Sequence, residues 1–223
     1  MNASDIINII IFIDLNDINF SMGIDFHKYN SAACSKDVQR HKRELCKTLA
    51  DYKVILSIDR LDYTKGILNR LQAYEAFLEK NPQWHGKVVM VMVVVPSRIG
   101  VEHYQEMKKQ IDALAGRISG RFGTLSWAPI LYQYKSLPFN QLVALYSVSD
   151  VALITPLRDG MNLIAKEYVA AKKDKTGVLI LSEMTGAARE MAEAIIMNPN
   201  NVEEIVEALE NAMNMPRDEQ ISR

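Results

Sequence analysis

Short apolar runs alternate with longer amphipathic stretches along most of this 223-residue chain. Residues 88–95 are all apolar and rich in valine, as expected of a strand covered on both faces. Residues 66–80 have apolar side chains at helical spacing, and Asn81 followed by Pro82 should end that helix. The same patterns predict further strands at residues 54–58, 124–127, 130–132, 151–155, 178–182 and 194–197. They predict further helices at residues 35–51, 101–118, 138–147, 161–173, 186–192 and 202–213.

Strands that alternate with helices of this length indicate right-handed β-α-β units and a parallel sheet. We therefore predict a doubly wound α/β domain. In such a fold the ligand lies at the carboxyl ends of the strands, in the loops that lead into the helices. The dinucleotide-binding fingerprint GxGxxG and the Walker loop are both absent from the sequence.

The balance of charged residues limits the kinds of molecule that the chain is expected to bind. The chain has 26 Lys and Arg against 27 Asp and Glu, which gives no reason to expect nucleic acid or an anionic membrane as partner. Any anion that binds must therefore be held by a few specific side chains or backbone groups, and not by a general positive charge. Cys34 and Cys46 are expected to be reduced thiols of a cytosolic protein, with a disulfide as the alternative. The scattered histidines predict no metal site.

The first 22 residues differ from the rest of the chain. Residues 6–13 are strongly apolar, and no Lys or Arg occurs before Lys28. The segment lacks the basic start and the cleavage site of a signal peptide, and its apolar run is too short to span a bilayer. We expect a strand or a boundary segment that is poorly tied to the remainder.

The loop after the expected strand 54–58 carries two cations in an unusual place. Arg60 and Lys65 lie five residues apart, between a buried strand and a helix. They can clamp a diphosphate there, because arginine offers a planar fork of donors and lysine a compact point charge. The alternative is a local turn in which Asp62 forms salt bridges with these cations.

A second loop, residues 155–162, leads into an expected helix and has the features of an anion site. Gly160 permits close approach of the backbone or a positive φ. Glu167 lies four residues beyond Leu163 on the same helix face, so a ligand held at the helix start can also reach it. The alternative is that Asp159 only caps the helix and Glu167 is exposed. The backbone N–H groups that would bind the anion belong to Gly160, Met161, Asn162 and Leu163.

Residues 59–66 (DRLDYTKG) and 156–168 (PLRDGMNLIAKEY) resemble the sequence signatures of the trehalose-6-phosphate synthases. The resemblance runs from about Gly23 to the C-terminus with the family's spacing throughout. Residues 1–22 do not match clearly. Shorter matches occur at residues 96–98, 115–118, 181–183 and 186–188.

The resemblance implies a retaining glycosyltransferase built from two Rossmann-like domains that face each other across a cleft. Residues 23–223 would form the C-terminal domain, which holds UDP-glucose. The reaction would move glucose to glucose-6-phosphate, giving trehalose-6-phosphate and UDP in the cytoplasm without a cofactor or a metal. The departing phosphate itself would help to deprotonate the acceptor hydroxyl on the front face of the sugar.

The resemblance also assigns a role to each candidate residue. Arg60 and Lys65 match the pair that grips the donor diphosphate and supports catalysis. Arg98 matches an arginine that reaches the phosphate of the acceptor, and the backbone around Leu137 matches a contact to uracil. In the second loop, Asp159 with the backbone of Gly160, Met161 and Asn162 would take a glucose hydroxyl, Leu163 would contact phosphate through its backbone, and Glu167 would bind the ribose hydroxyls.

We expect the family's N-terminal domain to be missing, and with it a glycine-rich loop and most of the acceptor pocket. The isolated chain should then fold and bind UDP or UDP-glucose weakly, but turn over little. Two alternatives stay open. The chain can be a non-catalytic UDP-sugar-binding module, or the donor half of a related glucosyltransferase with another acceptor.

Overall fold

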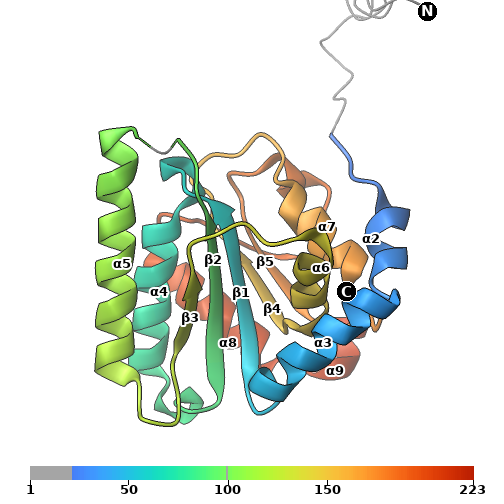
Figure 1. Cartoon of the computed structure of the whole chain (residues 1–223), viewed down its shortest axis with the longest axis horizontal. Coiled ribbons are helices and arrows are strands. Elements are labelled where there is room, and N and C mark those ends of the chain that lie inside the picture. Colours follow the sequence, from blue (N-terminus) through green and yellow to red (C-terminus); the bar gives the residue numbers. More distant parts are fainter. Residues whose placement is uncertain (1–21, 99) are drawn as a thin grey trace, which may run out of the picture.

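Six parallel strands form one sheet in the computed structural model, which describes residues 22–98 and 100–223 (Figure 1). The strands are β1 (Lys53–Arg60), β2 (Val88–Val95), β3 (Ile130–Gln133), β4 (Val151–Ile154), β5 (Val178–Ser182) and β6 (Ile195–Met197). Their order is β3-β2-β1-β4-β5-β6, and every neighbouring pair is parallel. This order confirms the predicted doubly wound, Rossmann-like fold. Residues 1–21 lie outside the described residues, so the expectation for segment 1–22 stays a prediction.

Helices cover both faces of the sheet (Figure 1). Helices α4 (Ile67–Lys80), α5 (Glu102–Phe122) and α8 (Val202–Asn214) share one buried cluster with one face, and α3 (Lys36–Leu49), α6 (Phe139–Val148) and α7 (Leu163–Ala171) share a second cluster with the other. The remaining helices of the described residues are α2 (Phe26–Ala32), α9 (Arg217–Ser222) and the 3-10 turns η1 (Tyr63–Lys65), η2 (Pro82–Trp84) and η3 (Gly186–Arg189). Within the described ranges, no helix is both long and apolar enough to cross a membrane.

Two local predictions differ from the structure, and two short helices were not predicted. Residues 124–127 form a turn closed by backbone hydrogen bonds between Thr124 and Trp127, not a strand. The indole of Trp127 is buried and donates to the Val88 carbonyl at 2.8 Å. Burial of this one aromatic side chain explains why the segment was predicted to be a buried strand. The helix expected at residues 186–192 is only the 3-10 turn η3. Helices α2 and α9 were not predicted, because they are short and have no buried residues.

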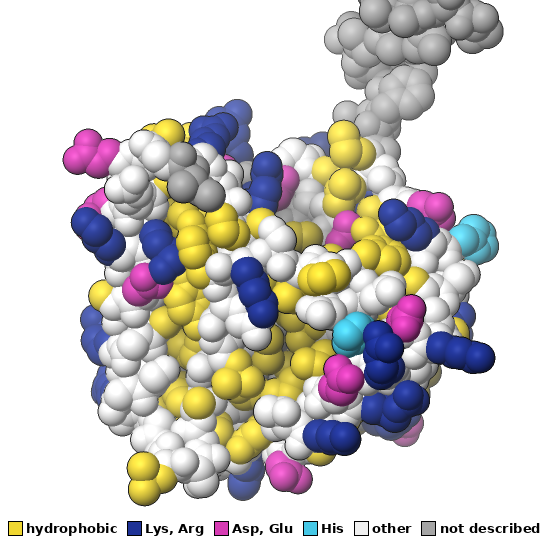
Figure 2. All heavy atoms as spheres, in the orientation of Figure 1, with side chains coloured by type: hydrophobic (Ala, Val, Ile, Leu, Met, Phe, Trp, Pro, Cys, Tyr) yellow, Lys and Arg dark blue, Asp and Glu magenta, His cyan; other side chains and the backbone are white. Residues whose placement is uncertain are grey.

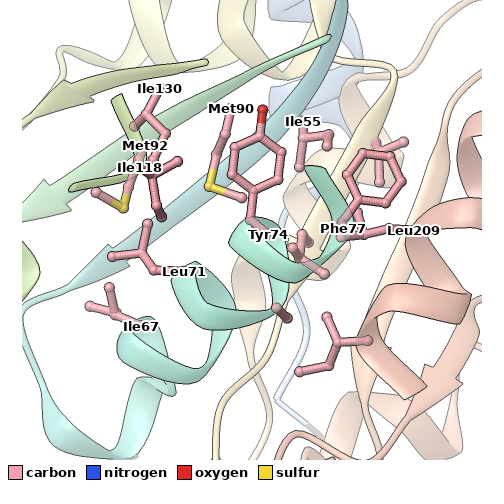
Figure 3. Close-up of a cluster of buried hydrophobic side chains, with 14 of the residues drawn as sticks. Ile55, Ile67, Leu71, Tyr74, Phe77, Met90, Met92, Ile118, Ile130 and Leu209 are labelled. Carbon is pink, nitrogen blue, oxygen red and sulfur yellow. The ribbon is translucent and has the colours of Figure 1, made fainter. Parts of the chain in front are cut away.

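Helix α4 is packed firmly against the sheet, which fixes the loop that precedes it. Leu71, Tyr74 and Phe77 are fully buried, and they lie with Met90 and Met92 of β2 in one cluster (Figure 3). Truncating a buried side chain in such a core removes about 2–5 kcal/mol of stability, so the cluster resists movement of the helix. The chain therefore passes from β1 into α4 at a well-defined place.

The sheet changes its direction of growth between β1 and β4. Strands β2 and β3 are added on one side of β1, and β4, β5 and β6 on the other. Helix α4, which follows β1, covers one face of the sheet, whereas α7, which follows β4, covers the opposite face. In doubly wound folds this switch point opens a crevice between the two loops at the carboxyl ends of the strands. Both candidate loops follow these two strands.

Candidate functional site

The loop after β1 is shaped by Asp62. Its carboxylate accepts hydrogen bonds from the backbone N–H of Thr64 at 2.9 Å and from the Thr64 hydroxyl at 2.8 Å. Burial opposes ionisation of Asp62, but these bonds and the charges of Lys65 and Arg98 lower its pKa below the ordinary value. The alternative of a salt-bridged turn is wrong. The Arg60 guanidinium is exposed, and it makes no hydrogen bond or ion pair with a described residue.

Gly66 lets this loop lie directly against the end of β4. Its φ is +62°, and a Cβ atom there would stand 2.1 Å from the carbonyl oxygen of Thr155. The Thr64 carbonyl accepts a hydrogen bond from the backbone N–H of Leu157 at 2.7 Å. Because any side chain at position 66 would meet both strain and a clash, the close contact of the two candidate loops requires glycine.

An ion pair joins the two candidate loops. Lys65 Nζ donates to Asp159 Oδ2 at 2.6 Å, and the two side chains are only 14% and 16% exposed. Asp159 also accepts from the side-chain amide of Asn162 at 3.2 Å and from the backbone N–H of Met161 at 3.4 Å. The fold thus brings together two residues that are 94 positions apart and were predicted to bind adjacent parts of one donor.

Helix α7 begins at Leu163 and is capped by Asn162 rather than by Asp159. The Asn162 side chain accepts from the backbone N–H of Ala165 at 3.1 Å, with a φ of +70° that is uncommon for a residue other than glycine. The alternative with Asp159 as the cap is therefore wrong. No described residue accepts a hydrogen bond from the backbone N–H of Gly160 or Leu163. These donors are available to an anion at the positive end of the helix dipole.

Two tyrosines hold Glu167 on helix α7. Tyr29 of α2 donates to Oε1 and Tyr146 of α6 donates to Oε2, each at 2.8 Å. Burial, and then the neighbouring Glu167, raise the pKa of both phenols well above its ordinary value, so both remain protonated donors. The exposed-glutamate alternative is wrong. Each carboxylate oxygen keeps a lone pair for a further donor such as a sugar hydroxyl.

A buried arginine absent from the predicted site ties the loops together. The Arg70 guanidinium donates to Asp59 Oδ2 at 2.7 Å, to Ser57 Oγ at 2.7 Å, to Thr155 Oγ1 at 3.0 Å and to the Lys65 carbonyl at 3.2 Å. Burial raises the pKa of Asp59, although the charge and hydrogen bond of Arg70 oppose this. Asp59 Oδ1 is buried without a hydrogen-bond partner in the described structure. The sequence did contain an indication of this role, because Arg70 is a charged residue at a position on the apolar face of an expected helix.

Arg98 and Leu137 follow β2 and β3 at the same edge of the sheet. Arg98 is exposed, has a φ of +48° and donates to the Tyr104 hydroxyl at 3.1 Å. Leu137 lies in the segment that crosses from β3 to α6 along this edge, and it packs against the buried cluster under α6 (Figure 1). Among the described residues, neither forms a hydrogen bond or ion pair with another candidate residue.

The candidate side chains at this edge carry charges of both signs, from Arg60, Lys65 and Arg98 and from Asp159 and Glu167. Figure 2 shows hydrophobic and uncharged side chains over much of the face that it presents, with basic and acidic side chains mostly around its margin. In the part of the chain that the structure describes, no group of three or more His, Cys, Asp or Glu side chains could hold a metal ion. Cys34 and Cys46 are exposed and not joined to each other.

The candidate residues lie along the carboxyl edge of the sheet, at the ends of β1, β2, β3 and β4 and in the segments that follow them. Hollows of about 450 and 380 Å³ lie elsewhere, the first beside Cys46 and the second beside Tyr52 and Trp127. Neither hollow is lined by a candidate residue. An edge of this kind needs a second surface before it can exclude water from a bound ligand.

These features define a Rossmann-like domain that offers cations and helix-start N–H groups to a phosphate, and carboxylates to hydroxyl groups. Such a combination suits a sugar linked to a nucleotide. Residues 15–223 match the model of glycosyltransferase family 20, and the chain belongs to this family. The predicted resemblance to trehalose-6-phosphate synthases is confirmed.

Individual relatives support the same assignment. The bifunctional trehalose-6-phosphate synthase/phosphatase of Thermoproteus tenax is 53% identical over 204 residues, which are 92% of this chain and 28% of that protein. An α,α-trehalose-phosphate synthase from Burkholderia xenovorans in complex with glucose-6-phosphate is 39% identical, with a TM-score of 0.87 over 90% of this chain and 45% of that one. An E. coli structure bound with UDP-2-fluoro glucose is 42% identical, with a TM-score of 0.83 over 90% and 44%. The chain thus spans less than half the length of these proteins.

Proposed function

We propose that residues 23–223 form the UDP-glucose-binding domain of a cytoplasmic, retaining glucosyltransferase that makes trehalose-6-phosphate from glucose-6-phosphate. The observation that carries this proposal is the Lys65–Asp159 pair at the switch point of the sheet. One partner suits a diphosphate and the other suits a sugar hydroxyl. Family membership supports the proposal, as do the ligands glucose-6-phosphate and UDP-2-fluoro glucose in the solved relatives.

The donor diphosphate lies between the loop after β1 and the start of α7. Negative charge grows on this group as the bond to glucose breaks. The backbone N–H of Leu163 is held at the start of α7, and the side chains of Arg60 and Lys65 come from the end of β1 and the loop after it, so all three can serve the growing charge. Preorganised donors of this kind lower the barrier because they need no reorientation during the reaction.

The other contacts are those that the resemblance to the family assigns. Asp159 takes a glucose hydroxyl, assisted by the backbone at residues 160–162, and Glu167 takes the ribose hydroxyls. The backbone around Leu137 meets the uracil edge. Arg98, on the neighbouring loop, reaches the phosphate of the acceptor, which is glucose-6-phosphate.

Catalysis requires a second Rossmann-like domain that faces this edge. The relatives are more than twice as long as the part of them that this chain matches. Closure of a cleft between two domains excludes water and orients the acceptor. We therefore expect the chain on its own to bind UDP-glucose but to turn over little.

Two measurements on the chain test this proposal. UDP-glucose at 100 times its dissociation constant should raise the free energy of unfolding by roughly 2.7 kcal/mol. Release of UDP in the presence of glucose-6-phosphate should stay at the level of a Lys65→Ala variant. No stabilisation by UDP-glucose would reject the donor site, and strong release of UDP would show that no second domain is needed.

Replacing Tyr146 with phenylalanine should weaken UDP binding about fivefold, because Glu167 loses one of the two hydrogen bonds that position it. Binding of pyrophosphate, which has no ribose, should not change. Calorimetric titration with both ligands measures the difference. Tyr168→Phe is the matched control, since the Tyr168 hydroxyl donates to backbone carbonyls and not to Glu167. An equal loss of UDP affinity in both variants would contradict the positioning of Glu167 by Tyr146.

A further inference from the structure

The Lys65–Asp159 ion pair engages both side chains with each other before a donor arrives. The backbones of the two residues are held independently of this pair. The Lys65 carbonyl accepts from Arg70, the Asp159 N–H donates to the Met184 carbonyl at 3.1 Å, and the Asp159 carbonyl accepts from the Gly186 N–H at 3.2 Å. The two side chains can therefore separate while the loops stay in place.

When the ion pair separates, a complete nucleotide sugar gives each of the two side chains a new polar partner. Lys65 exchanges the Asp159 carboxylate for a phosphate oxygen, and Asp159 exchanges the ammonium group for a sugar hydroxyl. Free UDP gives a new partner only to Lys65, because it carries no sugar for Asp159. Asp159 then stays mostly buried beside an added negative charge, with only the Asn162 amide and the Met161 N–H as partners. A charge left in that position opposes binding.

We propose that the Lys65–Asp159 pair determines ligand specificity: it makes the site bind a nucleoside diphosphate sugar more tightly than the free nucleoside diphosphate. The inference rests on the proposed function, because it places the diphosphate on Lys65 and the sugar on Asp159. Once the sugar has been transferred, Asp159 loses its hydroxyl partner. Its pairing with Lys65 then competes with UDP and promotes release of the product.

The test is a calorimetric titration of UDP and of UDP-glucose into the unaltered chain and into Asp159→Asn. UDP should bind about fivefold more tightly to the variant, the effect expected for an ion pair that is shielded from solvent but not fully buried. UDP-glucose should gain nothing, because the variant also loses the carboxylate that takes the hydroxyl. The preference for UDP-glucose over UDP should therefore shrink.

Two further variants make the result decisive. Asp159→Ser also removes the carboxylate and should give the same gain for UDP, so a folding defect in one variant does not decide the outcome. Glu183→Gln removes an exposed carboxylate from the loop after β5 and should leave UDP affinity unchanged. If UDP binds both Asp159 variants no better than the unaltered chain, the inference is overturned while the proposed function stands. If the unaltered chain binds neither ligand, both are overturned.

Discussion

Replacing Arg70 with methionine should lower the free energy of unfolding by about 3–5 kcal/mol. The Arg70–Asp59 pair is almost completely buried, with side chains 1% and 2% exposed. Removing the cation leaves the Asp59 carboxylate charged or protonated in a fully buried place, where one of its oxygens already lacks a partner among the described residues. Urea denaturation monitored by circular dichroism measures the loss.

Two further variants test whether the loss of stability comes from breaking the buried ion pair and not simply from replacing an arginine. The double change Arg70→Met with Asp59→Leu should recover most of the stability, because apolar side chains can replace a buried ion pair at little cost. Arg117→Met removes an exposed partner of Glu75 and should leave the free energy of unfolding nearly unchanged. If Arg70→Met is as stable as Arg117→Met, the buried pair does not support the loops.

Replacing Lys65 with alanine should reduce UDP-glucose affinity, and in a complete enzyme the rate of transfer, by about 100-fold. The variant loses a cation aimed at the diphosphate. It also frees the Asp159 carboxylate, whose charge then repels the same phosphate groups. Equilibrium dialysis with labelled UDP-glucose measures the affinity. Lys87→Ala, at the amino end of β2, is the control and should bind as the unaltered chain does. Similar affinities in both variants would show that Lys65 does not contact the donor.

The sheet and its ligand-binding edge could be predicted from the sequence because the signals are local. The run of apolar residues at 88–95 is strand β2, and residues 54–58 form the centre of β1. Lys65 and Asp159 were placed in loops after buried strands, and parallel strands bring such loops to one edge. Arg60 was also expected in a loop, but it is the last residue of β1, because the strand runs two residues beyond its apolar stretch. The residue types and their neighbours in the chain were enough for this step.

The contacts that organise the site depend on residues far apart in sequence, and no periodic pattern reports them. Tyr29 reaches Glu167 across 138 positions, and it comes from a helix that was not predicted. Arg70 was hidden within a stripe of apolar residues on α4. Asn162 caps α7 from a left-handed conformation, which a pattern of apolar residues does not report. The sequence therefore indicated the chemistry of the site but not the hydrogen bonds that hold it.

A nucleotide sugar should bind at the carboxyl edge of the sheet, between β1 and β4. A titration of UDP-glucose followed through the backbone amide signals in two-dimensional NMR spectra tests it most directly. A donor site at the switch point predicts saturable changes at Lys65, Gly160 and Leu163. Changes confined to the hollow beside Tyr52 and Trp127, or no changes at all, would contradict it.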